Sequence, residues 1–491
     1  MSSSVEKFKI FSFSGNTKIL HMTWFAFFIS FFVWFNQNGL LPTHIQKYLG
    51  LSNEQFNSLL LLNVILTIPA RIIIGMLVDK FGPKNTFSGL LAFAGIPCLI
   101  YALADSFTQL AIARLLMGFV GAGFVIGIRI ISEWFHARQA GIAEGIYGGW
   151  GNFGSAAATI SLPLLAAWIG GEHGWRYAIG LTGLLALVYS VVYFMNVTDT
   201  PKGSTYFRPN KSGAMEVTSR RDMWLYIVMT FPLYGALAAA TWRFTTPSYG
   251  LISPQTAVAV YLALAFLYLY NVAQIIRNNR EILSKPIAEI HRYKFKQVAI
   301  LNISYFVTFG SEIAVVMILA KFFKATFNVS DFWATVGGGS FMFMNLVARP
   351  WGGHLSDKIG RKKSLVIVLT CMTAGYVAMS LFSASWPFFV ALAVTVITSF
   401  FVQAGCGAVF ALVPLIKRRL TGQIAGMTGA YGNTGSVIFL TLYTLTSAQT
   451  LFAIIAVVSS CVLLSFLLLE EPKGAIAEVL PDGTVQMIDV E

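Results

Sequence analysis

Two arginines lie inside long apolar stretches of the sequence, each followed about two helical turns later by an Asp-Lys pair. Arg71 precedes Asp79, and Arg349 precedes Asp357 at the same spacing. A cation at membrane depth costs on the order of 3 kcal/mol on insertion scales, so it persists only where it is paired or functional. Guanidinium is planar and always charged, and it matches an oxyanion through paired hydrogen bonds. The two arginines therefore predict a site for one planar anion, and a structural ion pair with a glutamate is the alternative.

The segments around these arginines repeat within the chain. The string RIIIGMLVDKFGPK, which begins at Arg71, matches RPWGGHLSDKIGRK, which begins at Arg349. A second repeat relates GGWGNFGS, which begins at Gly148, to GAYGNTGS, which begins at Gly429. Parallel halves of this kind place a site at the midplane between them, and rocking of the halves opens that site to either side in turn.

The composition is that of a membrane protein. Hydrophobic residues make up 56% of the 491 residues and charged residues 11%, whereas a soluble domain carries about 25% charged residues. The apolar residues form about fourteen blocks, each long enough to cross a bilayer as a helix. The expected spans are 18–40, 55–78, 85–104, 107–132, 138–167, 175–196, 222–243, 254–275, 297–320, 331–352, 363–383, 386–412, 420–446 and 449–469.

The net charge of +13 indicates an orientation in the membrane. If the N-terminus is cytoplasmic, Lys and Arg concentrate on the cytoplasmic segments, which satisfies the positive-inside rule. Nucleic-acid binding is therefore a poor interpretation of this charge. The first apolar block is too long for a secretory signal, so we expect it to be a retained span.

The spans suggest two bundles of six helices with an insertion between them. Basic segments flank the two middle spans, and the short connection between those spans has no Lys or Arg, which favours a helical hairpin. A partly interfacial insertion is the alternative. We expect an N-terminal bundle at 1–196, a cytoplasmic linker with the hairpin (about 222–243 and 254–275) at 197–296, a C-terminal bundle at 297–470, and an unstructured cytoplasmic tail at 471–491.

These motifs resemble those of a known superfamily. GMLVDKFGPK and its second copy look like the loop motif of the major facilitator superfamily, and RLLMGFVGAG from Arg114 resembles its fourth-span motif. The two Gly-x-Gly-Asn-x-Gly strings, SEWF from Ser132 and YFVTFGSE from Tyr305 resemble signatures of its nitrate/nitrite porter family. The resemblance covers nearly the whole chain. It implies an all-α membrane protein with the major facilitator fold, its two bundles related by a pseudo-twofold axis, that transports nitrate and also nitrite by alternating access.

The resemblance also implies roles for single residues. It assigns both Arg71 and Arg349 to nitrate. A buried asparagine needs partners, and its amide can donate to an anion. The family's cavity has aromatic residues, of which a tyrosine would donate its hydroxyl and phenylalanines would enclose a flat anion. The further cavity residues expected are Asn152, Asn433, Tyr305, Phe124 and Phe309.

Glu312 lies in an apolar span, and an intramembrane carboxylate is a functional hypothesis by default. As a proton carrier it would take up a proton from outside and release it inside; the alternative is a static salt bridge to Arg129 or another arginine. Proton-coupled relatives tend to carry a carboxylate in this region. That favours nitrate/proton symport over nitrate/nitrite antiport, and transport of another small anion such as phosphate or an organic acid is a third possibility.

Small residues three or four apart let transmembrane helices approach closely. We therefore expect span 138–167 to slide against 331–352, and 420–446 against 55–78. The packing glycines are Gly148, Gly149, Gly151, Gly154, Gly429, Gly432 and Gly435.

A second group of residues is expected to act in gating. By resemblance, Asp79 and Asp357 would cap neighbouring helices or pair with cations and so hold the outward-open state. Arg129 and Glu133 share a helix face, and Arg114 is the remaining gating candidate.

The sequence contains no nucleophile–base pair, P-loop or metal-ligand spacing, so we expect no enzyme activity, cofactor or metal. The 4 cysteines lie in apolar blocks without paired spacing and are expected to be packing residues. The expected partners are nitrate, nitrite, protons and the lipid bilayer. We expect a multi-pass monomer whose N- and C-termini are cytoplasmic, as the distribution of Lys and Arg indicates. The family resemblance and the short basic N-terminus suggest the cell inner membrane, and the expected role is nitrate assimilation, with nitrate respiration as the alternative.

Overall fold

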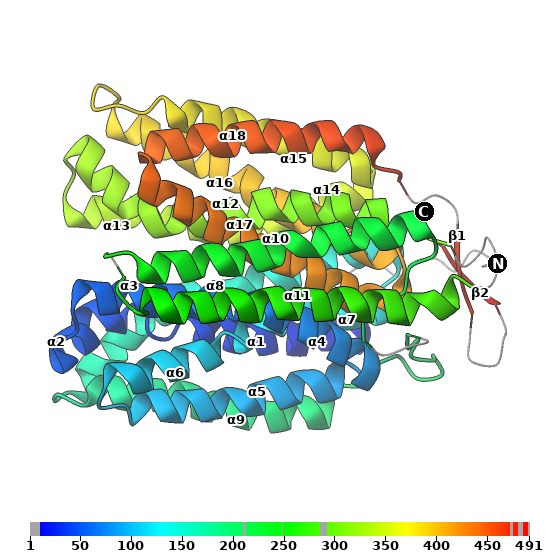
Figure 1. Ribbon diagram of the computed structural model, residues 1–491, viewed down its shortest axis with the longest axis horizontal. Coiled ribbons are helices and arrows are strands. Elements are labelled where there is room, and N and C mark those ends of the chain that lie inside the picture. Colours follow the sequence, from blue (N-terminus) through cyan, green and yellow to red (C-terminus); the bar gives the residue numbers. More distant parts are fainter. Residues whose placement is uncertain are drawn as a thin grey trace.

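A computed structural model describes residues 10–209, 213–247, 249–284, 292–471, 475–479 and 485–489. Its long helices run side by side along one direction (Figure 1). The first half of the chain supplies α1 (Gly15–Trp34), α2 (Gln46–Leu49), α3 (Asn53–Ile65), α4 (Thr67–Phe81), α5 (Pro83–Ala102), α6 (Phe107–Met117), α7 (Gly123–Trp134), α8 (Ala137–Ile169) and α9 (Gly174–Asn196).

The second half has a matching set of helices. It consists of α12 (Phe295–Phe327), α13 (Asp331–Phe343), α14 (Asn345–Ile359), α15 (Arg361–Ser380), α16 (Phe388–Phe410), α17 (Thr421–Leu445) and α18 (Ala448–Ser465). Between the halves lie α10 (Arg220–Thr245) and α11 (Pro254–Ile282). Short turns of other helix types complete the chain: η1 (Leu41–Ile45), η2 (Val120–Ala122), η4 (Val413–Leu415), η5 (Arg418–Leu420) and η6 (Phe466–Leu468).

Twelve helical segments of the described chain are long and apolar enough to cross a membrane. They confirm the prediction of an all-helical membrane protein. The prediction of an unstructured tail is wrong for two short segments, β1 (Ala475–Val479) and β2 (Val485–Asp489). These strands pair antiparallel, with Ala475 opposite Asp489. The β-branched and other apolar residues of these segments favour an extended conformation.

Two long helices are broken at equivalent places. The break between α3 and α4 falls at Leu66, and the break between α13 and α14 falls at Met344. The two breaks are as far apart in the sequence as Arg71 is from Arg349. Pro69 has no N–H to bond the carbonyl group of Ile65, the last residue of α3, so the helix ends there. Each break lies just before the helix turn that carries the arginine.

The two halves contact each other through crossed helix pairs, α8 on α14 and α17 on α4. Glycines permit both contacts. A Cβ atom at Gly145 would lie 2.5 Å from the carbonyl oxygen of Arg349, and one at Gly426 would lie 2.5 Å from that of Arg71. Each arginine is therefore held at a point where two helix backbones touch, and neither of these glycines was singled out from the sequence.

The signature glycines divide between two kinds of contact. Gly149 packs on Asn345 of α14, as predicted for this helix pair. Gly151 and Gly154 instead face α1, and Gly432 and Gly435 face α12. The prediction that all of them serve sliding between the halves is wrong, because each step of three residues rotates the direction by about 60°, and two such steps turn a glycine toward a different neighbouring helix.

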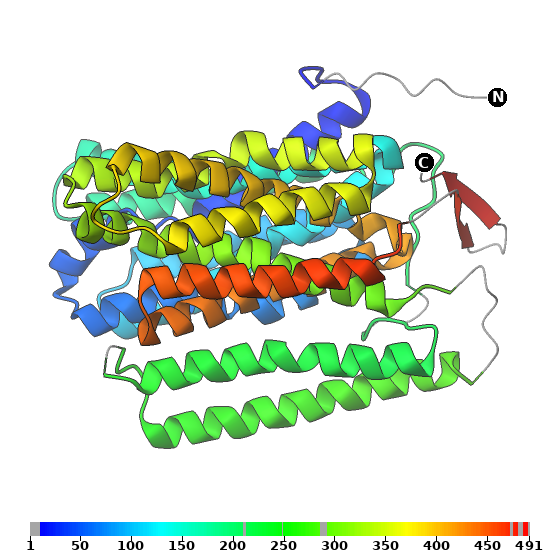
Figure 2. The same cartoon turned by 90° about the horizontal axis from the view of Figure 1, so that it is seen from above.

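Helices α10 and α11 form a pair along one side of the molecule (Figure 2). Helix α10 packs on α12, α17 and α3. The hydroxyl of Tyr431 on α17 donates to the carbonyl oxygen of Met229 on α10 at 2.5 Å. At the far end of the pair, Ser58 on α3 donates to the carbonyl oxygen of Tyr249 at 3.2 Å. The pair thus contacts helices from both halves of the chain.

Candidate functional site

Arg71 is fully buried in α4 and has unmade hydrogen bonds. Its Nη1 donates to the carbonyl oxygen of Gly429 on α17 at 2.6 Å. Its Nε and Nη2 have no partner in the described part of the chain. Because a buried cationic donor is costly to leave unpaired, these N–H groups are suited to bind an acceptor that enters from outside the protein.

Arg349, on α14, occupies the equivalent position in the second half but is anchored by side chains. Its Nη2 lies 2.7 Å from Oε2 of Glu312 on α12, and its Nε donates to Oε1 of Gln403 at 3.2 Å. Asn345 donates to the other oxygen of Glu312 at 3.0 Å. Of the two expected partners of Glu312, the structure brings another arginine, Arg349, and not Arg129. Gln403 and Asn345 were missed, although each is a polar residue within an apolar stretch.

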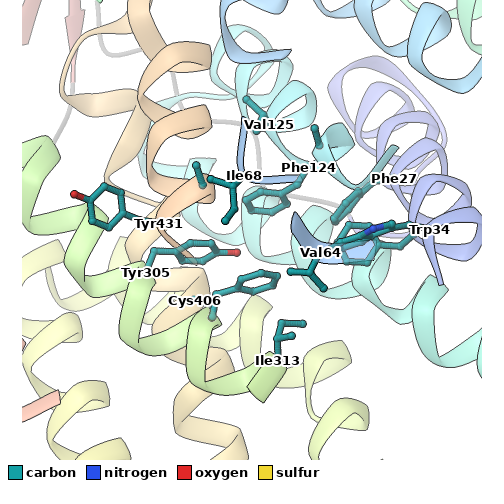
Figure 3. Close-up of a cluster of buried hydrophobic side chains, with 14 of the residues drawn as sticks. Phe27, Trp34, Val64, Ile68, Phe124, Val125, Tyr305, Ile313, Cys406 and Tyr431 are labelled. Atoms are coloured by element: carbon teal, nitrogen blue, oxygen red, sulfur yellow. The ribbon is translucent and has the colours of Figure 1, made fainter. Parts of the chain in front are cut away.

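A layer of aromatic rings lies against both guanidinium groups. The Cζ atom of Arg71 lies 5.0 Å and that of Arg349 5.7 Å from the ring centre of Phe309. Tyr305 stacks on Phe309 with ring centres 5.0 Å apart, and Phe124 lies parallel to Tyr305 at 6.3 Å. Figure 3 shows Tyr305 extending toward Phe124, with its hydroxyl at the tip. These rings exclude water from around both charges.

One further aromatic residue, Phe410 at the end of α16, closes this layer edge-on. Its ring centre lies 4.7 Å from that of Tyr305 and 4.5 Å from that of Phe124. The sequence carries no motif that distinguishes it from other phenylalanines in the spans. Only the fold brings Phe410 to the site.

The two predicted asparagines lie on the sides of α8 and α17 that face the arginines. Asn152 is one turn after Gly148, where a Cβ atom would lie 3.5 Å from Nη1 of Arg349. Asn433 is one turn after Gly429, whose Cβ would lie 2.9 Å from Cδ of Arg71. The amide nitrogens of both asparagines are buried without a partner in the described structure.

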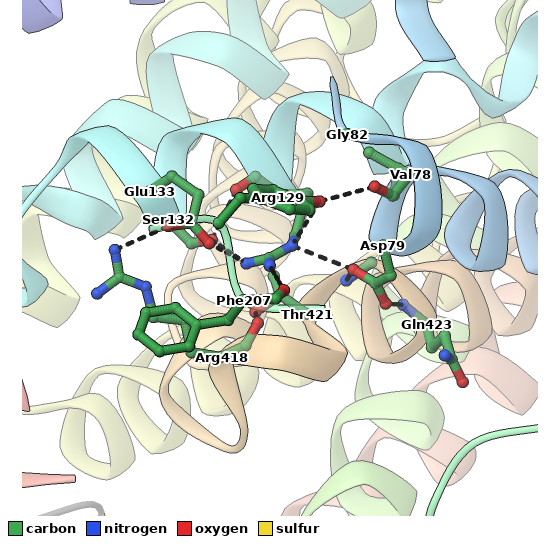
Figure 4. Close-up of polar contacts among 12 residues, drawn as sticks. Val78, Asp79, Gly82, Arg129, Ser132, Glu133, Phe207, Arg418, Thr421 and Gln423 are labelled. Atoms are coloured by element: carbon green, nitrogen blue, oxygen red, sulfur yellow. Dashed lines mark hydrogen bonds and ion pairs between the residues drawn. The ribbon is translucent and has the colours of Figure 1, made fainter. Parts of the chain in front are cut away.

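A polar cluster closes the end of the molecule that carries the loops after α4 and α14, which we call the loop-motif end. Asp79 accepts hydrogen bonds from the backbone N–H groups of Gly422 and Gln423 at 2.9 and 2.8 Å. Its carboxylate therefore caps the start of α17. Asp79 also lies 3.1 Å from Nε of Arg129 (Figure 4). Glu133 pairs with Arg129 one turn earlier on α7. The predicted cap and the predicted Arg129–Glu133 face are both present.

The equivalent cluster around Asp357 caps the start of α8. Its carboxylate accepts from the N–H groups of Gly141 and Ile142 at 3.1 and 2.8 Å and pairs with Arg361. Arg361 in turn donates to the carbonyl oxygen of Ala137 at 2.7 Å. Each half therefore holds the first turn of a helix from the other half, and the two halves are fastened at this end by the same chemistry used twice.

The segment that follows α9 enters the first cluster. The hydroxyl of Tyr206 donates to the carbonyl oxygen of Val78 at 2.7 Å, and Arg129 donates to the carbonyl oxygen of Phe207 at 2.6 Å. Burial raises the pKa of Tyr206, so the phenol stays a neutral hydrogen-bond donor. Arg418, from the second half of the chain, reaches Glu133 at 3.1 Å.

Arg114 lies elsewhere, and the structure does not bring it into either cluster. On α6 it donates to the carbonyl oxygen of Trp34 at 2.8 Å and to Oδ1 of Asn36 at 3.2 Å. Both partners belong to the first half of the chain and lie near the end opposite to the loop-motif end. The placement follows from the direction of α6, which begins at that opposite end.

The helical architecture, the buried arginines and the crossed contacts between halves define a class of protein, the two-bundle membrane transporters. The model of the Major Facilitator Superfamily matches residues 23–283 and 301–484. The solved structure of the human organic anion transporter MFSD10 has a TM-score of 0.60 at 13% identity, and the match covers 93% of this chain and 100% of that one. This likeness concerns the fold alone.

Curated relatives narrow the family. The nitrate/nitrite transporter NrtP of Nostoc punctiforme is 45% identical, over 96% of this chain and 95% of its own length. NrtP of Picosynechococcus sp. is 44% identical, over 98% and 97%. A high-affinity nitrate transporter of Oryza sativa is 27% identical, over 88% and 73%. The chain belongs to the major facilitator superfamily and, within it, to the nitrate/nitrite porter family. It is thus a multi-pass membrane transporter and not an enzyme.

Proposed function

We propose that the protein transports nitrate, and also nitrite, across the membrane by alternating access. The observation that carries this proposal is a pair of buried guanidinium groups, from Arg71 and Arg349, whose Cζ atoms lie 5.0 and 5.7 Å from the ring centre of Phe309. They come from equivalent positions in the two halves, so one anion between them would contact both halves at once. The nitrate/nitrite transporter names of the relatives support the same substrate.

In the proposed complex a flat anion lies against the aromatic layer. The free Nε and Nη2 of Arg71 would donate a fork of two hydrogen bonds to two of its oxygens. The hydroxyl of Tyr305 and the amide nitrogens of Asn152 and Asn433 would donate to the remaining lone pairs. Phe124, on the other side of Tyr305, would limit the thickness of the bound molecule. A weakly hydrated monovalent anion fits these surroundings best, because such an ion loses little on leaving water.

Glu312 supports coupling to protons. Its carboxylate is paired with Arg349, one of the two arginines that a bound anion would contact. The anion and Glu312 would therefore compete for Arg349. A proton on Glu312 removes that competition and restores the positive charge of the site, so that anion and proton bind together. We propose that the proton enters from the outside and leaves inside, which gives nitrate/proton symport.

Nitrate/nitrite antiport is the second candidate. In that case the Glu312–Arg349 pair stays intact throughout the cycle, and Arg71 alone changes partners as one anion replaces another. A third candidate is transport of phosphate or an organic acid, which two arginines also suit. The aromatic layer favours the smaller, flat anion over both.

We propose that the clusters at the loop-motif end form the gate of the outward-open state. Asp79, Asp357, Arg129 and Glu133 would lose their contacts between the halves when the bundles rock and the inner side opens. Arg114, which bonds only within the first half, would stabilise that bundle rather than act in the gate.

The proposed topology has fourteen spans. Helix α17 and the broken helix α13–α14 would cross the membrane in addition to the twelve more apolar segments, since their polar and small residues face the site and the opposite half. The halves would extend over 1–196 and 297–470. Helices α10 and α11 would form an inserted hairpin within 197–296, and 471–491 a tail. We place both termini in the cytoplasm and the protein, as a monomer, in the inner membrane, where it would serve nitrate assimilation.

Uptake of labelled nitrate into proteoliposomes tests these proposals. Acceleration by an inward proton gradient alone would establish symport. Acceleration only by nitrite loaded inside would establish exchange and leave Glu312 a structural residue. No nitrate flux in either condition, together with counterflow of phosphate or an organic acid, would overturn the proposed substrate.

A further inference from the structure

Glu144 in α8 is a buried carboxyl group that the anion site does not use. It is 2% exposed, and neither of its carboxyl oxygens has a hydrogen-bond partner in the described structure. One turn further along the helix, Gly148 faces the guanidinium group of Arg349. One turn earlier, the N–H group of Gly141 binds Asp357. Glu144 therefore lies between the central site and the loop-motif end.

The internal repeat shows that packing does not require a carboxyl group here. The string GIAEG from Gly141 matches GQIAG from Gly422, and Gly422 binds Asp79 just as Gly141 binds Asp357. The counterpart of Glu144 is Ala425, which is fully buried. A methyl group thus satisfies the equivalent contact in the other half of the molecule, and Glu144 is an addition to it.

Among the described residues, no cation donates a hydrogen bond to Glu144. The charged groups that face it are Arg361 and Asp357. These two already pair with each other, and Arg361 also donates to the carbonyl oxygen of Ala137 at 2.7 Å. An ionised, unpaired carboxylate in the interior is much more costly than a neutral carboxyl group with an unmade hydrogen bond. Glu144 is therefore protonated while α8 and α14 are in contact.

We propose that Glu144 is a proton-binding site that couples deprotonation at the loop-motif end to the separation of α8 from α14. When the helices part, water reaches the carboxyl group, its O–H bond breaks, and the proton passes to water on that side. The resulting carboxylate opposes closure until a proton returns. A higher pH at the loop-motif end thus favours opening at that end, whichever anion is carried and whether or not Glu312 carries a proton.

A cysteine reporter in the intact protein tests this proposal without nitrate. Ser356 on α14 is 1% exposed, so Ser356→Cys reports water access at the loop-motif end. Cys371 and Cys461, which are accessible, are replaced by serine. The labelling rate with a charged maleimide is measured in nanodiscs between about pH 6 and 8. In that range the thiol remains mostly protonated, so its own reactivity changes with pH in the same way in each protein. Three proteins are compared: one with native Glu144, one with Glu144→Gln, and a control with native Glu144 and Glu172→Gln. The control substitution removes an exposed carboxyl group.

The ratio of the labelling rate with Glu144 to that with Glu144→Gln cancels the pH dependence of the thiol itself. We expect this ratio to rise with pH, by up to about tenfold per unit, and the Glu172→Gln protein to follow the protein with native Glu144. A ratio that stays constant over the range would overturn the proposal. If Glu144→Gln fails to fold, Glu144→Ala, which copies the natural Ala425, replaces it. The outcome is separate from that of the transport assay, because no substrate is present.

Discussion

Arg349 and Glu312 form a buried ion pair in which Nη2 of the arginine lies 2.7 Å from Oε2 of the glutamate. Arg71, its counterpart in the repeat, pairs with no carboxylate among the described residues and keeps two unpartnered N–H-bearing nitrogens. Positions that are equivalent in the sequence thus differ in charge balance. Under the proposed function, this asymmetry would give the two arginines different roles: Arg71 would receive the anion directly, whereas Arg349 would first have to lose its ion pair with Glu312.

Arg71→Lys is expected to lower nitrate uptake strongly although the positive charge is kept. Lysine cannot donate a planar fork, so it loses at least one hydrogen bond to a charged group. Such a bond is worth about 1.5–3 kcal/mol, or roughly a ten- to hundredfold rise in KM. Uptake kinetics in proteoliposomes measure the change. Arg176→Lys, at a surface ion pair with Asp105, is the matched control and should transport normally, and normal kinetics in Arg71→Lys would contradict the role of Arg71.

Glu312→Gln is expected to abolish stimulation of uptake by an inward proton gradient while leaving nitrate bound. Glutamine keeps a similar volume and can accept from Asn345, but it neither titrates nor neutralises Arg349. The pH dependence of uptake, compared with that of nitrate/nitrite exchange in the same protein, measures the effect. Undiminished stimulation by the gradient in this variant would show that the proton uses another group.

Tyr305→Phe is expected to raise the KM for nitrate roughly ten- to hundredfold, since a hydrogen bond to a charged group contributes about 1.5–3 kcal/mol. Phenylalanine keeps the stacking on Phe309 and Phe124, so the stability of the protein should change little. Tyr431→Phe is the control, because its hydroxyl bonds Met229 on α10 and lies outside the site. An unchanged KM in Tyr305→Phe would remove the hydroxyl from the list of anion ligands.

Gly145→Ala is expected to reduce transport sharply in a protein that still inserts into the membrane. The added Cβ would lie 2.5 Å from the carbonyl oxygen of Arg349 and would push α8 away from α14. The maximal transport rate and the melting temperature of the purified variant measure the effect. Gly89→Ala is the control, since a Cβ there meets nothing within 4 Å and alanine favours the helix. Full activity in Gly145→Ala would mean that close contact of these helices is not needed.

The sequence by itself determined the class of protein, because the length of an apolar helix is dictated by the thickness of the bilayer. The internal repeat identified the two arginines and the helix-capping aspartates, since a buried charge is rare enough to be conspicuous in an apolar stretch. The asparagines followed from the need of a buried amide for partners, with the resemblance favouring Asn152. The aromatic residues Tyr305, Phe309 and Phe124 came from resemblance to the porter family, and the structure brings these rings together.

Only the tertiary structure decided how these residues divide their partners. Which arginine pairs with the carboxylate depends on the fold, which brings Glu312 of α12 within 2.7 Å of Arg349 of α14, 37 residues further along the chain. The directions of Gly151 and Gly432 depend on helix rotation, which small residues on several faces of α8 and α17 leave undetermined. The arrival of Gln403 and Phe410 at the site depends on the packing of α16. A sequence specifies which side chains are costly to bury, and the fold specifies which neighbour compensates each of them.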